Sequence, residues 1–283
     1  VAGLEMMRYK PNGWPMIPMF IEAVMRNGRV PEDYDMSHLL AAGAGCEAVN
    51  NNQLDRVQEF LHKHNCNVRF TVGYGSSEGG SNLTFQMAPK SVHNGNVGIP
   101  MPLNDMGVFK PGTQEELGYN EMGEICTVGP GNMLGYDRRS ATAKTLQRHA
   151  DGKIWLHTGD IGYVDEDGVF YVLNRGAAFR YGGGELAVLP MENRLADAKI
   201  KGIKDEFFVL IEDEDHDGYF VPYLYVVLED GYKVDDIIKD VQSCLEPYMF
   251  PVEILAIDER PFFHFKTNRI ELSKELKKKN HDC

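Results

Sequence analysis

Cysteine is scarce in this sequence, and no two cysteines stand close together. The five residues are scattered along 283 positions without a C-x-x-C pair, and their odd number argues against a framework of disulfide bonds. We therefore expect a reducing, cytoplasmic environment. The cysteines are Cys46, Cys66, Cys126, Cys244 and Cys283.

Long apolar runs and an excess of positive charge are also missing. No run approaches the roughly 18 apolar residues that a membrane-spanning helix needs. The net charge is −13, and an acidic chain is poorly suited to nucleic acids or anionic membrane surfaces. We expect neither a membrane span nor a nucleic-acid partner.

Two common site signatures are absent as well. The nine histidines include no H-x-x-x-H pair, so a zinc site of that kind is not expected. The glycine run at residues 182–184 could cradle a phosphate, but Glu185 and Leu186 follow it instead of Lys and Ser or Thr. A Walker-type phosphate loop is therefore unsupported.

The chain has enough apolar residues, 43%, for real hydrophobic cores. At about 150 residues per domain, its length favours two domains. The first part alternates elements: a helix at 18–27, a buried strand from Leu39 into the small-residue turn 43–45, a helix at 50–64 and a strand at 68–72. This order predicts an α/β region with parallel strands.

A glycine-rich turn, residues 73–78, follows the strand at 68–72. Such turns at the ends of α/β strands often bind ligands. Tyr74 offers an aromatic face for a purine, Ser77 a hydroxyl for a phosphate oxygen, and Glu78 an oxygen ligand for Mg²⁺. The turns at 43–45 and 73–78 can also be read as an ordinary tight turn and an ordinary polar loop.

Two short strands at 161–164 and 169–173 flank an Asp-Gly turn and predict a β-hairpin. A hairpin keeps its ends together, so Asp160 and Arg175 can face one space. A carboxylate accepts hydrogen bonds from a vicinal diol such as ribose, and a guanidinium donates to hydroxyl or phosphate oxygens. On spacing alone, a surface hairpin with incidental charges is an equal alternative.

The remaining segments predict two further regions. Short strands between Gly and Pro turns at 95–136 suit a small β-barrel, followed by a short helix at 140–148. Beyond Arg175 the pattern is α+β, with a lysine-rich tail that favours a solvated helix face. The predicted elements are helices at 190–198 and 234–245, strands at 207–211, 222–228 and 252–257, and the tail at 272–279.

Several of these strings resemble motifs of the adenylate-forming (AMP-binding) enzymes, which include acyl- and aryl-CoA synthetases, luciferases and the adenylation domains of peptide synthetases. Residues 158–160 (Thr-Gly-Asp), 167–168 (Asp-Gly) and Arg175 resemble the ribose-binding segment of that family. The string 73–78 resembles its Y-G-x-[S/T]-E motif, and 43–45 resembles its adenine-facing loop.

The resemblance implies a fold and a domain division. Residues 1–175 would be the C-terminal portion of the large AMP-binding domain, with an α/β part and a small β-barrel, and residues 176–283 a small, mobile α+β domain. The chain would be the C-terminal half of such an enzyme. The family's phosphate loop would precede Val1, so we expect residues 1–283 alone not to adenylate a carboxylate.

The resemblance also implies an acyl-CoA synthetase-like reaction. The full-length protein would use ATP to turn a carboxylic acid into an acyl-adenylate, release AMP, and pass the acyl group to CoA. Glu78 would hold Mg²⁺ and act in catalysis with the cation of Lys266 or Arg269. The nucleotide would contact Ala44, Gly45, Tyr74, Gly75, Ser77, Asp160 and Arg175, and the phosphopantetheine arm of the thiol would pass Gly183 and Gly184.

This sequence departs from the family pattern at two motifs, the hinge and the motif that ends in a catalytic lysine. Residues 176–178 (Gly-Ala-Ala) stand where the hinge usually carries Lys or Asp, and Arg269 stands where the T-x-x-G-K motif ends in its lysine, with Lys266 as a nearby substitute. Arg and Lys are not equivalent cations. A ligase that loads a phosphopantetheinyl carrier protein, and a degenerate nucleotide-binding protein without adenylation activity, are therefore the alternatives.

Overall fold

The computed structural model describes residues 2–86, 90–263 and 266–281, so Cys283 lies outside the described residues. The chain divides into two compact units, residues 1–49 with 53–176 and residues 50–52 with 177–283. Within the described ranges, Cys46, Cys66, Cys126 and Cys244 are free thiols, and no helix is long and apolar enough to cross a membrane. The cytoplasmic location and the functions of the two units stay predictions.

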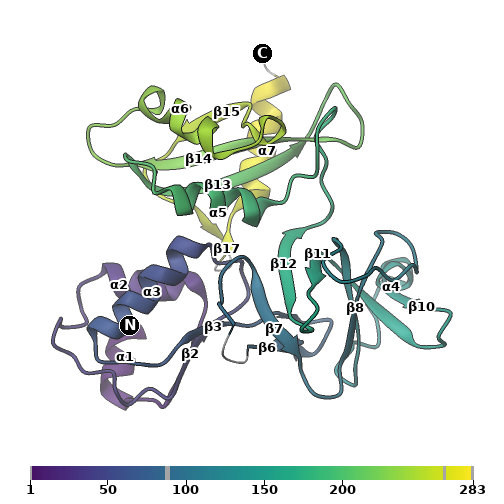
Figure 1. The fold of residues 1–283 in the computed structure, drawn as a ribbon, viewed down its shortest axis with the longest axis horizontal. Coiled ribbons are helices and arrows are strands. Elements are labelled where there is room, and N and C mark those ends of the chain that lie inside the picture. The colour runs from purple at the N-terminus through teal and green to yellow at the C-terminus, as the bar shows by residue number, and fades with distance from the viewer. Residues whose placement is uncertain (1, 87–89, 264–265, 282–283) are drawn as a thin grey trace. The chain divides into compact units, whose positions relative to one another are not determined.

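The first unit begins with a three-stranded sheet in the order β1-β2-β3, and its strands are parallel as predicted. Three helices lie beside it (Figure 1). Apolar side chains of α2 and α3, such as Ile21 and Leu61, are fully buried in one core with Phe70 of β3. The bounds are α1 Ala2–Tyr9, β1 Gly13–Met16, α2 Pro18–Arg26, β2 Ala41–Ala44, α3 Asn51–Lys63 and β3 Phe70–Val72.

A curled seven-stranded sheet completes this unit, in the order β6-β7-β12-β11-β9-β8 with β10 paired to β11. This half-barrel agrees with the predicted β-barrel part. A small hairpin, β4 and β5, precedes it. The bounds are β4 Gly75–Ser76, β5 Ser81–Asn82, β6 Thr84–Phe85, β7 Asn96–Pro100, β8 Asp105–Phe109, β9 Gly123–Val128, β10 Leu146–Arg148, β11 Ile154–Val164 and β12 Phe170–Arg175.

The helix predicted at 140–148 was wrong at its C-terminal end. Helix α4 spans Arg139–Thr145, and the next residues form β10 instead. Leu146 pairs with Leu156 of β11 in an antiparallel register. Pairing with a neighbouring strand therefore overrides the local preference for helix at these positions.

The predicted hairpin forms, and it is longer than its sequence signal. Strands β11 and β12 pair from Val164 opposite Phe170 back to Asp160 opposite Arg175, with an irregularity between Ile161 and Gly162. A Cβ atom at Gly162 would collide with the carbonyl of Tyr171. Glycine at this position therefore permits the close approach of the two strands.

The second unit is α+β, as predicted, around the sheet β13-β14-β15. Successive residues of β13 point to opposite faces. Phe208 packs in the core that includes residues of α5 and α6, whereas Phe207 and Val209 pack with Leu276 of α7. The predicted tail is thus a helix with one buried side. The bounds are α5 Val188–Ala198, β13 Ile203–Glu212, β14 Phe220–Leu228, α6 Val234–Cys244, β15 Glu253–Ala256, β16 Phe262–Phe263, β17 Lys266–Thr267 and α7 Arg269–His281.

Candidate functional site

Asp160 lies at the centre of a polar constellation in the first unit. Its position on β11 puts it directly opposite Arg175 on β12. The Arg175 Nη1 donates to Asp160 Oδ1 at 2.8 Å, and the Tyr74 hydroxyl donates to Asp160 Oδ2 at 2.6 Å. The structure therefore brings together residues from two motifs that are 86 positions apart in sequence.

The three side chains differ in their access to solvent. Tyr74 is 9% exposed, so its ring is packed in the core, whereas the side chain of Arg175 is 75% exposed. Burial, and then the negative charge of Asp160, raise the pKa of Tyr74 well above its ordinary value. The phenol therefore stays protonated and acts as a donor. In the structure, Tyr74 donates a hydrogen bond that orients Asp160. Stacking of a purine on its ring stays a prediction.

The constellation retains hydrogen-bonding capacity for a ligand. A carboxylate has about four acceptor sites and a guanidinium five donors. Arg175 and Tyr74 occupy one site on each oxygen of Asp160, which leaves acceptor sites for the two hydroxyls of a diol. The exposed guanidinium keeps donors for a hydroxyl or a phosphate. This donor and acceptor set fits a ribose with a neighbouring phosphate.

The two motifs predicted to contact a nucleotide base and phosphates are adjacent in space. The Gly73 N–H donates to the carbonyl of Ala44 at 2.9 Å, which places residues 43–45 beside the start of the turn 73–78. Ala44 is buried in β2, and Gly45 follows that strand. Gly75 pairs with Asn82 in the hairpin of β4 and β5, and a Cβ there would collide with the carbonyl of Ser81.

Ser77 and Glu78 lie in the turn between β4 and β5, and Ser77 is exposed. Residues 75–79 also fit the spacing G-x-S-x-G, which marks the nucleophilic serine of α/β-hydrolases where a strand turns into a helix. Here strand β5 follows instead of a helix, so Ser77 is not on such an elbow. A hydroxyl in an exposed turn remains suitable for contact with a phosphate.

The sequence analysis missed the partner of Glu78. The Tyr136 hydroxyl donates to Glu78 Oε1 at 2.7 Å. This hydrogen bond holds the pKa of Glu78 below its usual range, so the side chain is a carboxylate at neutral pH. A carboxylate oxygen is the type of ligand that Mg²⁺ takes.

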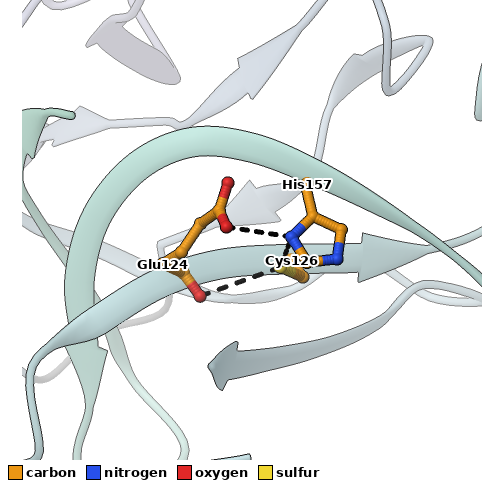
Figure 2. Close-up of side chains that lie close together, drawn as sticks. All are labelled: Glu124, Cys126 and His157. Atoms are coloured by element: carbon orange, nitrogen blue, oxygen red, sulfur yellow. Dashed lines mark hydrogen bonds and ion pairs between the residues drawn. The ribbon is translucent and has the colours of Figure 1, made fainter. Parts of the chain in front are cut away.

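A largely buried polar cluster, also unpredicted, supports the strand that carries Asp160. Figure 2 shows Glu124 and Cys126 of β9 beside His157 of β11, with the ring of His157 directed at both. Glu124 Oε2 lies 2.9 Å from His157 Nδ1, and the other oxygen of Glu124 accepts from the Gly159 N–H at 3.0 Å. Glu124 thus ties β9 to the residue just before Asp160.

The rest of this cluster is satisfied by hydrogen bonds. Cys126 Sγ lies 3.4 Å from His157 Nδ1, and His149 Nε2 lies 2.9 Å from His157 Nε2. Burial, followed by the charge of Glu124, raises the pKa of the Cys126 thiol, which disfavours the thiolate that a metal would need. Among the described residues only Glu124, Cys126 and His157 group closely enough to hold an ion, one ligand short of a structural zinc site.

The candidate residues of the second unit have unequal environments. Arg269 begins α7, and its Nη2 donates to Glu192 Oε1 at 2.8 Å while its Nε donates to the carbonyl of Phe208 at 3.0 Å. The side chains of Arg269 and Glu192 are 30% and 6% exposed. Lys266, on β17, is exposed. The guanidinium of Arg269 is thus tied into its own unit.

Gly183 and Gly184 form a tight loop in the second unit. The loop is closed by hydrogen bonds from the Arg180 N–H to the carbonyl of Gly184 and from the Gly183 N–H to the carbonyl of Arg180, each 3.0 Å. A Cβ at Gly184 would lie 3.0 Å from the ring of Tyr248. These glycines therefore allow the loop to pack closely on an aromatic ring, and their contact with phosphopantetheine stays a prediction.

One hollow in the first unit lies away from this constellation. It has a volume of about 330 Å³ and is lined by residues that include Asp55, Gln58, Arg69 and His93. None of the predicted nucleotide residues lines it.

Comparison with known proteins gives independent information. The family model described as AMP-binding enzyme matches residues 4–137. Curated relatives include 4-coumarate–CoA ligase 2 of Nicotiana tabacum, 30% identical over 251 residues, and 4-coumarate–CoA ligase of Vanilla planifolia, 29% identical over 249 residues. The matches cover 86% and 83% of this chain but 44% and 42% of those proteins, so the chain spans less than half of their length.

Solved structures match over a larger share of the chain at lower identity. ATP-bound MatB from Rhodopseudomonas palustris has a TM-score of 0.80 at 20% identity and covers 97% of this chain and 52% of its own. The o-succinylbenzoate CoA synthetase of Bacillus subtilis, in complex with its acyl-adenylate intermediate, has a TM-score of 0.70 at 21% identity, with 96% and 52% coverage. These likenesses establish the fold.

Proposed function

The chain belongs to the AMP-binding enzyme family, and from this premise we propose that the whole protein is an ATP-dependent acid–thiol ligase. The observation that carries the proposal is the hydrogen-bonded set of Tyr74, Asp160 and Arg175. Its remaining acceptors and donors suit a ribose and a phosphate, and it lies in the same unit as Glu78. The relatives named as 4-coumarate–CoA ligases support the same reaction class.

The proposed reaction has two steps. In the first, an oxygen of the carboxylic acid substrate attacks the α-phosphorus of ATP, and pyrophosphate leaves. This step is needed because a carboxylate is a poor electrophile until it carries a good leaving group. In the second, a thiol attacks the acyl carbon, the bond to AMP breaks, and a thioester forms.

Nucleotide binding falls to residues of the first unit. Asp160 would accept hydrogen bonds from the ribose hydroxyls, and Tyr74 and Arg175 would keep its carboxylate in place. Ala44, Gly45 and Gly75 would give the adenine close access to the backbone, and Ser77 would donate to a phosphate oxygen. Glu78 would hold Mg²⁺, which when bound neutralises phosphate charge.

Between the two cations, we assign the adenylation step to Lys266. Its side chain is exposed, whereas the guanidinium of Arg269 already binds Glu192 and the carbonyl of Phe208. To reach a nucleotide, Arg269 would leave a nearly buried carboxylate without its cation, which is energetically costly. Among the described residues, Lys266 makes no comparable ion pair that it would have to break.

CoA is the proposed thiol, with Gly183 and Gly184 along the path of its phosphopantetheine arm. A phosphopantetheinyl carrier protein is the second acceptor, since it presents the same arm.

Exchange of labelled pyrophosphate into ATP, with the full-length protein, tests the first step. We expect exchange that depends on a carboxylic acid from a panel of aromatic, aliphatic and dicarboxylic acids and that falls in Glu78→Gln. Adding CoA or a carrier protein then identifies the acceptor by thioester formation. A folded protein that binds AMP but shows no acid-dependent exchange would instead be a degenerate nucleotide-binding protein.

A further inference from the structure

The loop that follows β9 lies directly against the turn that carries Glu78. The Met133 N–H donates to the carbonyl of Glu78 at 2.7 Å. Gly80 has φ of +82°, and a Cβ at this residue would collide with the carbonyl of Gly131. A side chain at Gly131 would in turn approach the carbonyl of Gly79 to 2.8 Å. The two backbones therefore touch without intervening side chains.

This loop ends on Tyr136, whose hydroxyl donates to Glu78 Oε1 at 2.7 Å. Tyr136 and Glu78 are 58 positions apart in sequence. Glu78 thus has two contacts with one loop, one to its backbone carbonyl and one to its carboxylate. Because the backbone contact holds the turn in place, the phenol meets a carboxylate whose main chain is already positioned.

Helix α4 holds Tyr136 from the other side. Thr142 Oγ1 accepts from the Tyr136 N–H at 2.8 Å, and the same hydroxyl lies 3.2 Å from the Tyr136 carbonyl. Gly135 has φ of +148°, and a Cβ there would lie 2.9 Å from Thr142 Cγ2. A glycine at 135 and a threonine one helical turn into α4 are therefore what this backbone path requires.

A glutamate side chain in a turn can adopt several rotamers, and a hydrogen bond to one oxygen restricts them. The phenol occupies one acceptor site of Oε1, and a carboxylate has about four such sites. Glu78 therefore keeps capacity for a cation while its orientation is limited. Carboxylates that bind metals are commonly held by outer hydrogen bonds of this kind.

We propose that Tyr136 is a positioning residue that orients the Glu78 carboxylate toward a divalent cation, and that Thr142 of α4 holds Tyr136 in place. This inference rests on the proposed function, in which Glu78 holds the cation of a nucleotide–metal complex. The inference adds Tyr136 and Thr142 as the residues that fix the orientation of the Glu78 carboxylate. Tyr136 itself touches neither the nucleotide nor the acid in this assignment.

The test uses the full-length protein and its Tyr136→Phe variant, which removes one hydroxyl from a side chain that is 41% exposed. Binding of Mn²⁺ in the presence of ATP is measured by electron paramagnetic resonance. Loss of an outer hydrogen bond to a metal ligand typically weakens metal affinity about 10- to 100-fold, and we expect a loss in this range. AMP affinity, measured by calorimetry without metal, should stay within about twofold, since only the metal ligand is affected.

Three variants make the result specific. Thr142→Val should weaken Mn²⁺ binding in the same direction but less, because the phenol is retained while its anchor is removed. Glu78→Gln should weaken it at least as much as Tyr136→Phe. Tyr119→Phe, which changes a tyrosine that is 62% exposed on another loop, should leave both measurements unchanged.

Two results would overturn the inference. In the first, Tyr136→Phe leaves Mn²⁺ affinity unchanged while Glu78→Gln lowers it. In the second, Tyr136→Phe lowers AMP and Mn²⁺ affinity equally, which is the behaviour of a residue that only stabilises the loop. Failure of the proposed function has a different signature, because it is the loss of acid-dependent pyrophosphate exchange in the unmodified protein, whereas the Mn²⁺ measurement needs only ATP.

Discussion

Asp160 and Arg175 lie directly opposite each other on neighbouring antiparallel strands, and the guanidinium donates to the carboxylate at 2.8 Å. The hydroxyl of Tyr74 holds the second oxygen of Asp160 at 2.6 Å. Asp160 is 8% exposed, so its charge is stabilised by these partners rather than by bulk water. The same two contacts that make the carboxylate tolerable in the fold also orient it for a ligand.

Tyr74→Phe should therefore lower both stability and nucleotide affinity. The phenol donates to a charged acceptor, and hydrogen bonds to charged groups contribute about 1.5–3 kcal/mol. We expect a loss of free energy of unfolding in this range and a smaller loss of AMP affinity, because Arg175 still holds Asp160. Urea unfolding and calorimetry on the full-length protein measure the two effects. Tyr119→Phe is the control, and equal losses in both variants would argue against the contact.

Lys266→Ala and Arg269→Ala should fail in different ways. Removing Arg269 leaves Glu192, whose side chain is 6% exposed, without its cation, although its Oε1 still accepts from the Phe208 N–H. The lost hydrogen bond to a charged group contributes about 1.5–3 kcal/mol. Arg269→Ala should therefore lower the unfolding free energy. Lys266→Ala changes an exposed side chain, so its effect on stability should lie within about 0.5 kcal/mol, while acid-dependent pyrophosphate exchange falls.

The assignment of the cation would be reversed by the opposite pattern. If Arg269→Ala is as stable as the unmodified protein and loses exchange, and Lys266→Ala keeps full exchange, then the guanidinium leaves Glu192 during the reaction. Arg269→Lys separates the contribution of the charge from that of the hydrogen bond to the Phe208 carbonyl. It keeps a positive charge near Glu192 but loses the Nε donor to that carbonyl.

Glu124→Gln should change how stability depends on pH. Burial acts to raise the pKa of Glu124, but the hydrogen bond and charge of His157, with the Gly159 N–H, outweigh it and leave the pKa below its ordinary value. Above the unfolded-state pKa of about 4.3, the full stabilisation is present. As the pH falls from there, the unfolded chain takes up its proton first, and stability is lost until the pH passes the folded-state pKa.

The variant cannot titrate at this position, so its stability should fall less steeply below about pH 4.3. Urea unfolding across this acid range measures the slope, and Glu166→Gln, on an exposed turn residue, serves as the control. Identical slopes in the unmodified protein and Glu124→Gln would show that the carboxylate gains nothing from His157 in the folded state.

Local signals made much of the fold predictable. The Asp-Gly turn between alternating strands predicted the hairpin of β11 and β12, and the spacing of apolar residues predicted α2, α3 and α6. These features depend on residues within one or two turns of chain. The motif strings at 43–45 and 73–78 could also be placed at the ends of strands, because strands β2 and β3 have clear sequence signals.

The contacts that define the candidate site could not be predicted in this way. Tyr74 reaches Asp160 across 86 positions, and Arg269 reaches Glu192 across 77. Nothing in the local pattern of either tyrosine indicates that Tyr74 is buried and Tyr136 exposed. Such pairs form only when the sheet curls and its loops pack, so their residues carry no periodic signal. For the same reason β10 replaced the end of a predicted helix.

The most direct test of the account is a comparison of AMP with 2′,3′-dideoxy-AMP, each titrated by calorimetry into the full-length protein and its Asp160→Ala variant. Asp160→Asn, which keeps an acceptor for the Tyr74 hydroxyl, guards against a folding defect, and thermal unfolding monitors all three proteins. We predict that the unmodified protein prefers AMP by at least about tenfold, which corresponds to about 1.4 kcal/mol, and that Asp160→Ala binds both nucleotides equally. A folded Asp160→Ala variant that keeps the full preference for AMP would contradict the assignment of Asp160 to the ribose.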